Sequence, residues 1–295
     1  MCNRWCRLST DESLWKMVDL GQATVPPGLL GQVLSRGCEV LRLSRATLKP
    51  DIFISSTSGL PTFPTTTMES SRLQYLDLSM ANLSLYCTEE LLLSCTALKT
   101  LAMQMCSVTD ITCTGISHNT SLEVLHLGHV DGLTPLGISR ILSSCRKLEE
   151  LNLGWTGLSR EAVQTVVILS PQSLRRLCLA GNRDTLLDEH VETMLNSCPY
   201  LTELDVSGIT SEQRFPTLIF LFCSDSTNLT AVSLNMIVER LTDLESLSTS
   251  RCYGISPSSY LILSSCCPTL LYLNVFGLLR DQAMVEFRQK LKGGI

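Results

Sequence analysis

The sequence predicts an α/β solenoid, in which short parallel strands line a concave face and helices line the convex face. One observation is a Leu-x-x-Leu-x-Leu pattern that recurs every 24–27 residues over most of the chain. A second is that apolar residues between these patterns follow the i, i+3, i+4, i+7 spacing of helices. Alternating strands and helices give parallel strands and a right-handed solenoid, because each helix returns the chain to the start of the next strand.

Each strand is predicted from a leucine pair that alternates with more polar residues, which places the leucines on the buried side. The clear copies are Leu73/Leu76/Leu78, Leu98/Leu101/Met103, Leu122/Leu125/Leu127, Leu148/Leu151/Leu153, Leu174/Leu177/Leu179, Leu201/Leu204/Val206 and Leu270/Leu273/Val275. Weaker copies are Trp15/Val18/Leu20, Cys38/Leu41/Leu43 and Leu244/Leu247/Thr249. The chain therefore contains about ten leucine-rich repeats.

Helices are predicted between the strands. Thr134-Pro135 reads as an N-cap followed by proline at the first helical position, and Ser256-Pro257 repeats that start. Asp188 opens a further helix. Their inner stripes are Ile138, Ile141, Leu142 and Cys145 for the first, Tyr260, Leu263 and Cys267 for the second, and Val191, Met194, Leu195 and Cys198 for the third. A cysteine closes several helices three residues before the next strand: Cys95, Cys145, Cys198 and Cys267.

The repeats set the domain organisation. Residues 1–15 form an N-terminal segment, residues 16–280 the repeats, and residues 281–295 a C-terminal cap helix and tail. The repeats are irregular at 44–72 and 207–243. In the second of these stretches, Leu229/Val232/Leu234 is either an additional strand or part of an irregular insertion, and we favour the insertion.

Composition narrows the classes of partner. The chain carries 28 acidic and 23 basic residues, with a net charge of −5 and no basic block, which argues against nucleic acid. No apolar run approaches the roughly 20 residues of a membrane-spanning helix, and we expect no membrane partner. The 14 cysteines recur at repeat positions as small buried hydrophobic residues do, which favours a reducing compartment, the nucleus or the cytoplasm.

The residues give little indication of catalysis. His126 and His129 lie across a predicted strand and its exit, so their side chains should point to different faces. Most cysteines occupy buried positions where the reactive thiolate is disfavoured, and glycine-rich phosphate-binding loops are absent. We expect no catalytic residue, no cofactor and no metal.

The open strand face is the predicted protein-binding surface. Its candidate residues are Tyr75, Asp77, Gln104, His126, Glu150, Asn152, Trp155, Arg176, Glu203, Asp205, Ser248, Tyr272, Asn274 and Phe276. Because binding energy concentrates in few residues, we expect about one in four to matter. Trp155 and Phe276 are the strongest candidates, since large aromatic side chains on an open surface favour a covering partner. For Trp155, packing on the next repeat is an equal alternative.

The position three residues after the last strand leucine separates subtypes of leucine-rich repeat. It is Cys106, Asn182 and Cys252 in three repeats, and the Cys-Pro-x-Leu entries at 198–201 and 267–270 follow the same cysteine-containing subtype. The opening segment, CNRWCRLSTDESLW, is similar to the closing part of an F-box. Together these features resemble the F-box leucine-rich-repeat family, and the likeness covers nearly the whole chain.

This resemblance implies a non-catalytic substrate receptor of a Skp–cullin–F-box ubiquitin ligase. The F-box would dock the Skp adaptor, and the repeats would present a phosphorylated cell-cycle regulator together with a small cyclin-kinase accessory protein. Because the early F-box helices do not precede Met1, the alternative is a stand-alone interaction scaffold or competitor that lacks adaptor binding. For the same reason, the apolar residues of the opening segment are favoured as a cap on the first repeat over an adaptor contact; they are Trp5, Leu8, Leu14 and Trp15.

Overall fold

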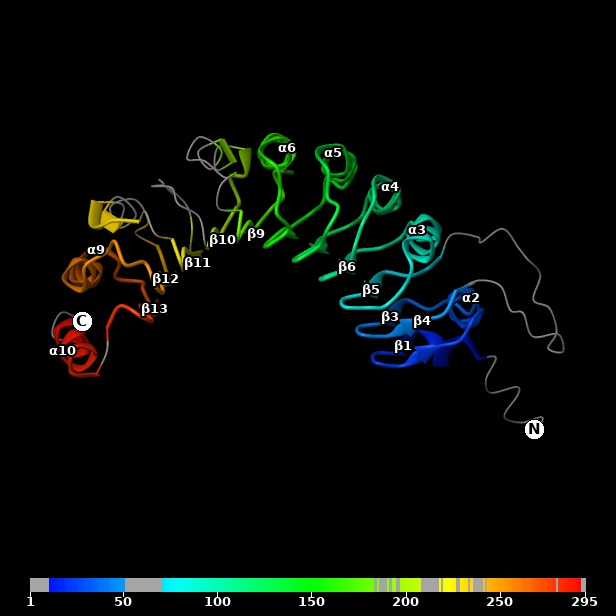
Figure 1. Cartoon of the computed structure of the whole chain (residues 1–295), viewed down its shortest axis with the longest axis horizontal. Helices are drawn as coiled ribbons and strands as arrows, with labels where there is room; N and C mark the ends of the chain where they lie inside the picture. Colours follow the sequence, from blue (N-terminus) through cyan, green and yellow to red (C-terminus); the bar gives the residue numbers. More distant parts are fainter. Residues whose placement is uncertain are drawn as a thin grey trace. The chain divides into compact units, whose positions relative to one another are not determined.

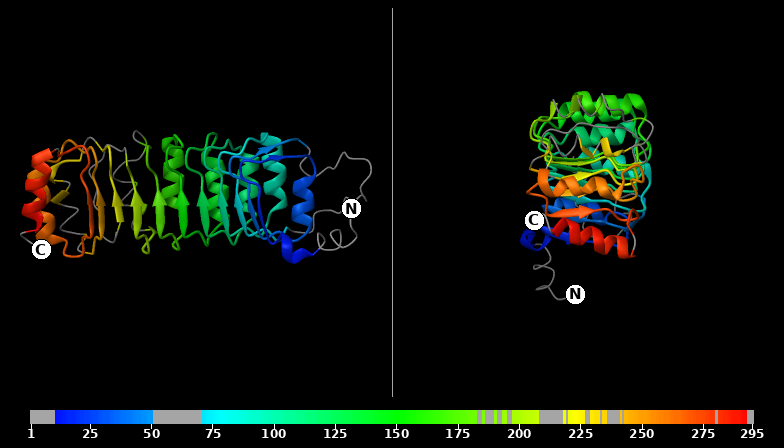
Figure 2. Two further views of the ribbon diagram at one scale, coloured as in Figure 1. Left: turned by 90° about the horizontal axis from the view of Figure 1, so that it is seen from below. Right: turned by 90° about the vertical axis from the view of Figure 1, so that its left-hand side faces the viewer.

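The computed structural model describes residues 11–50, 71–182, 197–207, 220–226, 243–279 and 281–292, with isolated positions between 183 and 242. The chain divides into two compact units, residues 1–148 and 149–295. Each unit is an α/β leucine-rich-repeat solenoid of parallel strands with helices on one side of them (Figures 1 and 2). The predicted fold class is therefore confirmed. Among the described residues, no helix has the length and apolar character that a membrane span requires.

The strands of the first unit follow one another in chain order, and each pairs in parallel with the next. They are β1 (Met17–Asp19), β3 (Val40–Arg42), β5 (Tyr75–Asp77), β6 (Thr100–Ala102) and β7 (Val124–His126). The central residues of neighbouring strands align with one another: Val18 with Leu41, Leu41 with Leu76, and Leu76 with Leu101. A second ladder pairs β2 (Thr24–Val25) with β4 (Thr47–Leu48).

The helices of the first unit lie on one side of its strands (Figure 1). They are α2 (Leu29–Ser35), α3 (Leu85–Ser94), α4 (Asp110–Ser117) and α5 (Pro135–Ser144), and the short 3-10 helix η1 (Glu12–Trp15) precedes β1. The predicted start of α5 is confirmed, because the Thr134 hydroxyl accepts a hydrogen bond of 2.9 Å from the Gly137 amide. Ile138, Ile141 and Leu142 are buried as predicted.

The second unit repeats this arrangement. Its strands are β8 (Glu150–Asn152), β9 (Arg176–Cys178), β10 (Glu203–Asp205), β11 (Phe220–Phe222), β12 (Ser246–Ser248) and β13 (Tyr272–Asn274). Its helices within the described residues include α6 (Arg160–Leu169), η2 (Pro257–Ile262), α9 (Leu263–Cys266) and α10 (Asp281–Lys292). Helix α10 lies in the stretch where we predicted a C-terminal cap helix, and its Phe287 packs edge-on against buried Tyr260 at 6.4 Å between ring centres.

We favoured an irregular insertion at 207–243; the triplet in question is indeed not a strand, but the stretch contains a strand that we did not predict. Strand β11 occupies this stretch and pairs in parallel with both β10 and β12. Leu218, Leu221 and Cys223 form its buried triplet, with a cysteine at the position that leucine, methionine or valine occupies in the predicted repeats. The proposed triplet is not the strand, because residues 231–232 and 234–235 are helical and Val232 is 62% exposed. The described residues thus contain five repeat strands in the first unit and six in the second, one more than predicted.

Two helix predictions had other outcomes. Pro257 begins a 3-10 helix rather than an α-helix, and Ser256 makes no side-chain capping bond, although Tyr260, Leu263 and Cys267 are buried as predicted. Asp188, Val191 and Leu195 lie outside the described residues, whereas Met194 and Cys198 are buried.

The predicted cysteines at helix ends are buried. Three of the thiols reach backbone carbonyls of the preceding repeat, with 3.4 Å from Cys145 Sγ to the Asn119 oxygen, 3.7 Å from Cys198 Sγ to the Pro171 oxygen and 3.5 Å from Cys267 Sγ to the Leu241 oxygen. Burial raises the pKa of Cys95 and of Cys145 to about 11, so both thiols stay protonated. The Cys145 thiol is thus a weak donor that links consecutive repeats.

Candidate protein-binding surface

The residues that flank the central apolar residue of each strand form the strand face. Most of the predicted residues lie there, partly or largely exposed, and Tyr272 and Phe276 are 56% and 70% exposed. Within the first unit the structure brings together Tyr75, Asp77, Gln104 and His126, and within the second Glu150, Asn152, Arg176, Glu203, Asp205, Tyr272, Asn274 and Phe276. Ser248 also flanks the central leucine of β12, but it is only 4% exposed and its hydroxyl lies 3.0 Å from that of Ser224, so it is not open to a partner as we expected.

Four of the predicted contact residues also hold the turn at the end of their own strand. The carboxylate or amide oxygen accepts a hydrogen bond from the backbone two residues on. The four pairs are Asp77 with Ser79 N (2.9 Å), Asn152 with Gly154 N (2.9 Å), Asp205 with Ser207 N (2.9 Å) and Asn274 with Phe276 N (3.1 Å). Such local bonds are the usual reason for Asp and Asn in turns. Asp or Asn recurs at this strand-end position in the sequence, which indicates a turn, but we predicted these residues only as partner contacts.

The strand face of the second unit carries a charged row across three strands. Strand register places Arg176 between Glu150 and Glu203. Arg176 forms an ion pair with Glu150, in which its Nε donates a hydrogen bond of 2.7 Å to Oε2. Burial raises the pKa of Glu203, Arg176 opposes that rise, and the neighbouring carboxylates of Glu150 and Asp205 add to it. The row therefore has more carboxylates than guanidinium groups to neutralise them.

A hollow of about 260 Å³ opens over this row. Its lining includes two residues that we had not predicted, Cys178 and Phe222. The Cys178 thiol lies 3.5 Å from Asp205 Oδ2, and burial followed by the Asp205 charge raises the pKa of Cys178 to about 12. The thiol is thus a protonated donor and not a nucleophile. The hollow combines an aromatic side chain with carboxylates, a chemistry that suits a cationic side chain.

A second row of side chains projects from the turn that follows each strand. In each of these turns that the structure describes at this position, which leaves out the turn after β10, one residue has a positive φ, which is uncommon outside glycine. These turn residues are Gln22, Arg45, Met80, Met105 and His129 in the first unit, and Trp155, Gly181, Asp225, Arg251 and Gly277 in the second. Their backbone amides extend the ladder beyond the strands, as Trp155 N donates 2.6 Å to the Ala180 oxygen. We had predicted only Trp155 from this row.

Both readings of Trp155 describe part of its environment. The side chain is 55% exposed. Its ring also covers Gly181, the equivalent turn residue of the next repeat, where an added Cβ would lie 2.5 Å from Trp155 Cε3. The backbone of Gly181 has φ +78°. Glycine at this turn therefore leaves room for the indole, which packs on the next repeat and still presents one side to solvent.

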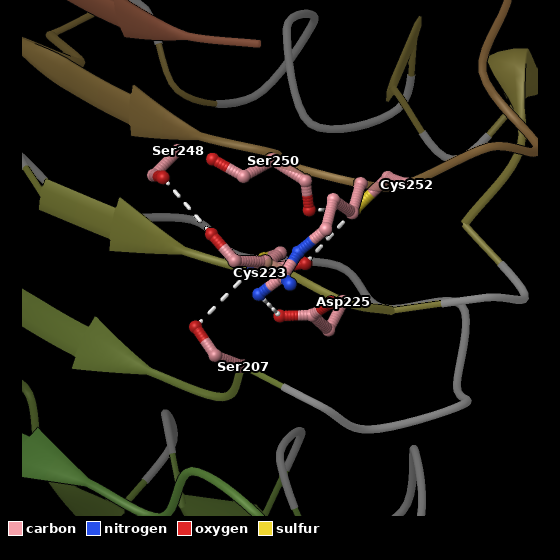
Figure 3. Close-up of polar contacts among 8 residues, drawn as sticks. Ser207, Cys223, Asp225, Ser248, Ser250 and Cys252 are labelled. Carbon is pink, nitrogen blue, oxygen red and sulfur yellow. Dashed lines mark hydrogen bonds and ion pairs between the residues drawn. The ribbon is translucent and has the colours of Figure 1, made fainter. Parts of the chain in front are cut away.

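Asp225 and Arg251 form a second such contact between neighbouring turns. Arg251 Nη2 donates a hydrogen bond of 2.7 Å to Asp225 Oδ2 (Figure 3). Beneath them the Cys252 thiol lies 3.0 Å from the Cys223 carbonyl oxygen, and the Ser224 amide donates to the Ser207 hydroxyl at 3.2 Å. The three consecutive repeats are thus joined by side chains as well as by strand pairing.

The asparagine and cysteine positions that defined the repeat subtype have a common role. Cys106 Sγ lies 3.2 Å from the Leu78 carbonyl of the preceding repeat, as Cys252 does with Cys223. Asn182 makes more bonds, because its Nδ2 donates to the Leu179 oxygen at 2.9 Å and its Oδ1 accepts from the Leu158 amide at 3.0 Å. These positions stabilise the repeat turn and are not part of the exposed surface.

The N-terminal candidates separate into two groups. Trp5 and Leu8 lie outside the described residues. Leu14 is 61% exposed, while the Arg36 guanidinium lies 4.2 Å from the centre of the Trp15 ring. Trp15 therefore contacts the end of α2, as a capping residue would.

The histidines and cysteines of the described residues do not assemble a candidate metal site, since no group of three potential His, Cys, Asp or Glu ligands converges among them. His126 lies on β7, whereas His129 is in the positive-φ turn that follows.

Comparison with known proteins identifies the repeats. A family model described as the SKP2 LRR domain matches residues 28–213. An internalin, InlF, from Listeria monocytogenes has a TM-score of 0.53 and 14% sequence identity, covering 94% of this chain and 86% of the internalin; it shows the fold alone. LegL7 from Legionella pneumophila has a TM-score of 0.47 with 15% identity over 94% of this chain and 97% of its own. The Rad7–Elc1 complex in yeast has a TM-score of 0.41 with 14% identity, covering 75% of this chain and 74% of the matched chain.

Proposed function

The chain belongs to the SKP2-type family of leucine-rich-repeat domains, and from this premise we propose that it is the substrate-recognition subunit, of F-box type, of a Skp–cullin–F-box ubiquitin ligase. It would bind target proteins through its strand face for ubiquitin-dependent degradation in cell-cycle control, in the nucleus or cytoplasm. The chain itself would perform no chemistry, because partner subunits transfer ubiquitin. Leucine-rich-repeat domains typically serve as such protein-binding scaffolds.

The observation that carries the proposal is the strand face of the second unit together with the turns that follow its strands. Trp155 and Phe276 are large aromatic side chains that are 55% and 70% exposed. Between their repeats lies the hollow with Glu203, whose carboxylate has no ion pair of its own among the described residues. Exposed aromatic anchors beside partly desolvated charge are typical of binding hot spots. This face would hold a basic segment of a cell-cycle regulator or of a cyclin-kinase accessory protein that presents the phosphorylated target.

Binding of the Skp adaptor decides between the two functional classes. Purified full chain would be mixed with purified Skp adaptor, and complex formation measured by calorimetry. Affinity in the micromolar range or tighter supports the receptor. Absence of binding at those concentrations removes the ligase role and leaves the interaction scaffold or competitor.

The target surface is tested separately with a phosphorylated cyclin-dependent-kinase inhibitor and its accessory protein. Trp155→Ala is expected to weaken capture roughly tenfold or more, as hot-spot truncations do. Glu203→Gln removes the unpaired charge and should weaken it less. Ile168→Ala is the matched control, because Ile168 is 60% exposed on α6 of the same unit. Equal affinity of the Trp155 variant and the control would move the binding surface elsewhere.

A further inference from the structure

The first unit has its own hollow, of about 510 Å³, at the strand ends of β1, β3 and β5. Two arginines line it: Arg42 from β3 and Arg45 from the turn after β3. Gln22 and Gln104 add two amide side chains, for which no hydrogen bond to another described residue occurs. The hollow therefore contains donors whose partners are not supplied from within the described part of the chain.

Of the two aspartates in the lining, Asp19 forms an ion pair with Arg42. Strand register places Arg42 between Asp19 and Asp77. The Asp19 Oδ2 atom is 3.9 Å from the Arg42 guanidinium, and the Oδ1 atoms of both aspartates accept bonds from their own turns. Neither aspartate forms an ion pair with Arg45. The hollow thus carries two aspartates and two arginines, and Arg45 forms no ion pair among the described residues.

Arg45 has one contact within the described residues. Its Nε lies 3.4 Å from the sulfur of Met80, a weak acceptor. The terminal nitrogens of the guanidinium, which carry four of its five N–H donors, have no acceptor among those residues. Arg45 is exposed, so water satisfies these groups in the free protein. A ligand with two acceptor oxygens could replace that water.

The second unit contains the same arginine with its acceptor in place. Arg45 and Arg251 are both positive-φ turn residues, with φ of 57° and 58°. The turn residue of the preceding repeat is Gln22 for Arg45 and Asp225 for Arg251, and both have φ of 60°. Asp225 Oδ2 accepts a hydrogen bond of 2.7 Å from Arg251. The two sites thus share a backbone geometry and differ in whether the neighbouring turn provides a carboxylate.

We propose that the Arg45 end of this hollow binds the carboxylate of an acidic side chain from a partner polypeptide. The carboxylate takes the place that Asp225 has beside Arg251. The amides of Gln22 and Gln104 then offer donors and acceptors to the partner's backbone, and Met80, 43% exposed, offers an apolar contact beside the charge. The site lies in the first unit and does not depend on the function proposed for the strand face of the second.

The test uses the full chain labelled with ¹⁵N-arginine and two probes, N-acetyl-Gly-Glu-Gly-amide and its Gln counterpart. The Arg45 Nε–Hε resonance is expected to shift saturably with the Glu probe, with a dissociation constant on the order of millimolar. The Gln probe should bind roughly fivefold more weakly or not at all, which is the upper range for an exposed ion pair. Equal shifts with both probes, or no shift with the Glu probe, would overturn the proposal.

Gln22→Asp is the decisive variant because it leaves Arg45 in place. It installs the carboxylate that the second unit already has, so the new carboxylate should occupy Arg45 and abolish the response to the Glu probe. Arg45→Gln, whose binding is followed through neighbouring amide resonances, gives the same loss if the first variant folds poorly. Arg251→Gln is the matched control and should leave probe binding unchanged. Full binding by Gln22→Asp would contradict the proposed geometry.

Discussion

Arg45 in the first unit and Arg251 in the second occupy the same backbone position of their repeats, yet their surroundings differ. Arg251 is paired with Asp225 and its side chain lies over Gly277, where an added Cβ would be 2.8 Å from Arg251 Cγ. Arg45 has Met80 beside it and a hollow in front of it. In the second unit, turn residues of neighbouring repeats contact one another, as Arg251 contacts Asp225 and Trp155 contacts Gly181. In the first unit, the Arg45 guanidinium contacts only the sulfur of Met80 among the described residues. A repeat backbone therefore fixes positions, and the residues of the neighbouring repeat decide which of them remain open.

The largest expected effect on stability comes from replacing Gly181, the turn glycine of the second unit that Trp155 covers. Gly181→Val adds a side chain at φ +78°, where its Cβ would lie 2.5 Å from Trp155. We expect a loss of about 2–3 kcal/mol in the free energy of unfolding, measured with urea, from backbone strain and displacement of the indole. Parent-like stability of Gly181→Val would refute the proposed packing of Trp155 on Gly181.

The equivalent turn of the first unit should respond in the opposite direction. Met105→Gly should raise the free energy of unfolding by up to ~1 kcal/mol, because Met105 has a left-handed φ of 58°, which glycine adopts without strain.

The next largest effect on stability concerns the residue that follows the positive-φ turn residue, which is Asn182 in the second unit and Cys106 in the first. Asn182→Ala is expected to cost about 2 kcal/mol, because the Leu158 amide, which is buried, loses its acceptor. Cys106→Ala in the first unit should cost about 1 kcal/mol or less, since only a weak thiol bond and little volume are lost. Urea unfolding of both variants measures the difference. Equal losses of stability would contradict the view that the Asn182 hydrogen bonds contribute more than the weak Cys106 thiol bond.

Alkaline pH should affect both units alike. Burial raises the pKa of Cys145 and of Cys252 to about 11, against an ordinary value of 9.0. The folded pKa is the higher one, so this contribution to stability is complete below pH 9 and is lost as pH rises towards 11. The loss is up to ~1.4 kcal/mol per pH unit for each thiol. Cys145→Ala and Cys252→Ala should each flatten the alkaline fall of urea-measured stability; a slope unchanged in both would show that other groups cause it.

The smallest effect concerns the exposed ion pair itself. Asp225→Asn should cost about 0.2–1 kcal/mol, because Arg251 and Asp225 are both partly exposed and solvent screens their attraction. Gln22→Asp should gain a similar amount in the first unit. Thermal unfolding at low and high salt measures both, and high salt should reduce both differences. A loss that salt does not alter would point to a role of Asp225 other than charge.

Much of the fold followed from the spacing of leucines. The buried triplets from Leu73/Leu76/Leu78 to Leu201/Leu204/Val206 are all buried in the structure, as are the inner residues of α5. Strand β11 was missed because Cys223 takes the third apolar position and the repeat before it is short. A search that accepted cysteine there, as the other buried cysteines justify, would have found Leu218, Leu221 and Cys223.

The candidate surface was less predictable. Alternation placed Glu150, Arg176 and Glu203 on one face, and register then brought them together. It did not indicate that Asp77 and Asp205 hold their own turns, since an exposed aspartate and a turn-forming one look alike in a sequence. Nor did it locate Phe222 in the hollow of the second unit.

The sequence by itself determined that the chain is a leucine-rich-repeat protein, because a period of buried leucines and capped helices leaves few other ways to bury apolar surface. Only the tertiary structure decided which side chains meet across repeats. Whether Arg45 or Arg251 has a carboxylate, and whether Trp155 has a glycine to cover, depends on residues about one repeat away. Strand register sets these contacts, and it can be read only once neighbouring repeats are stacked.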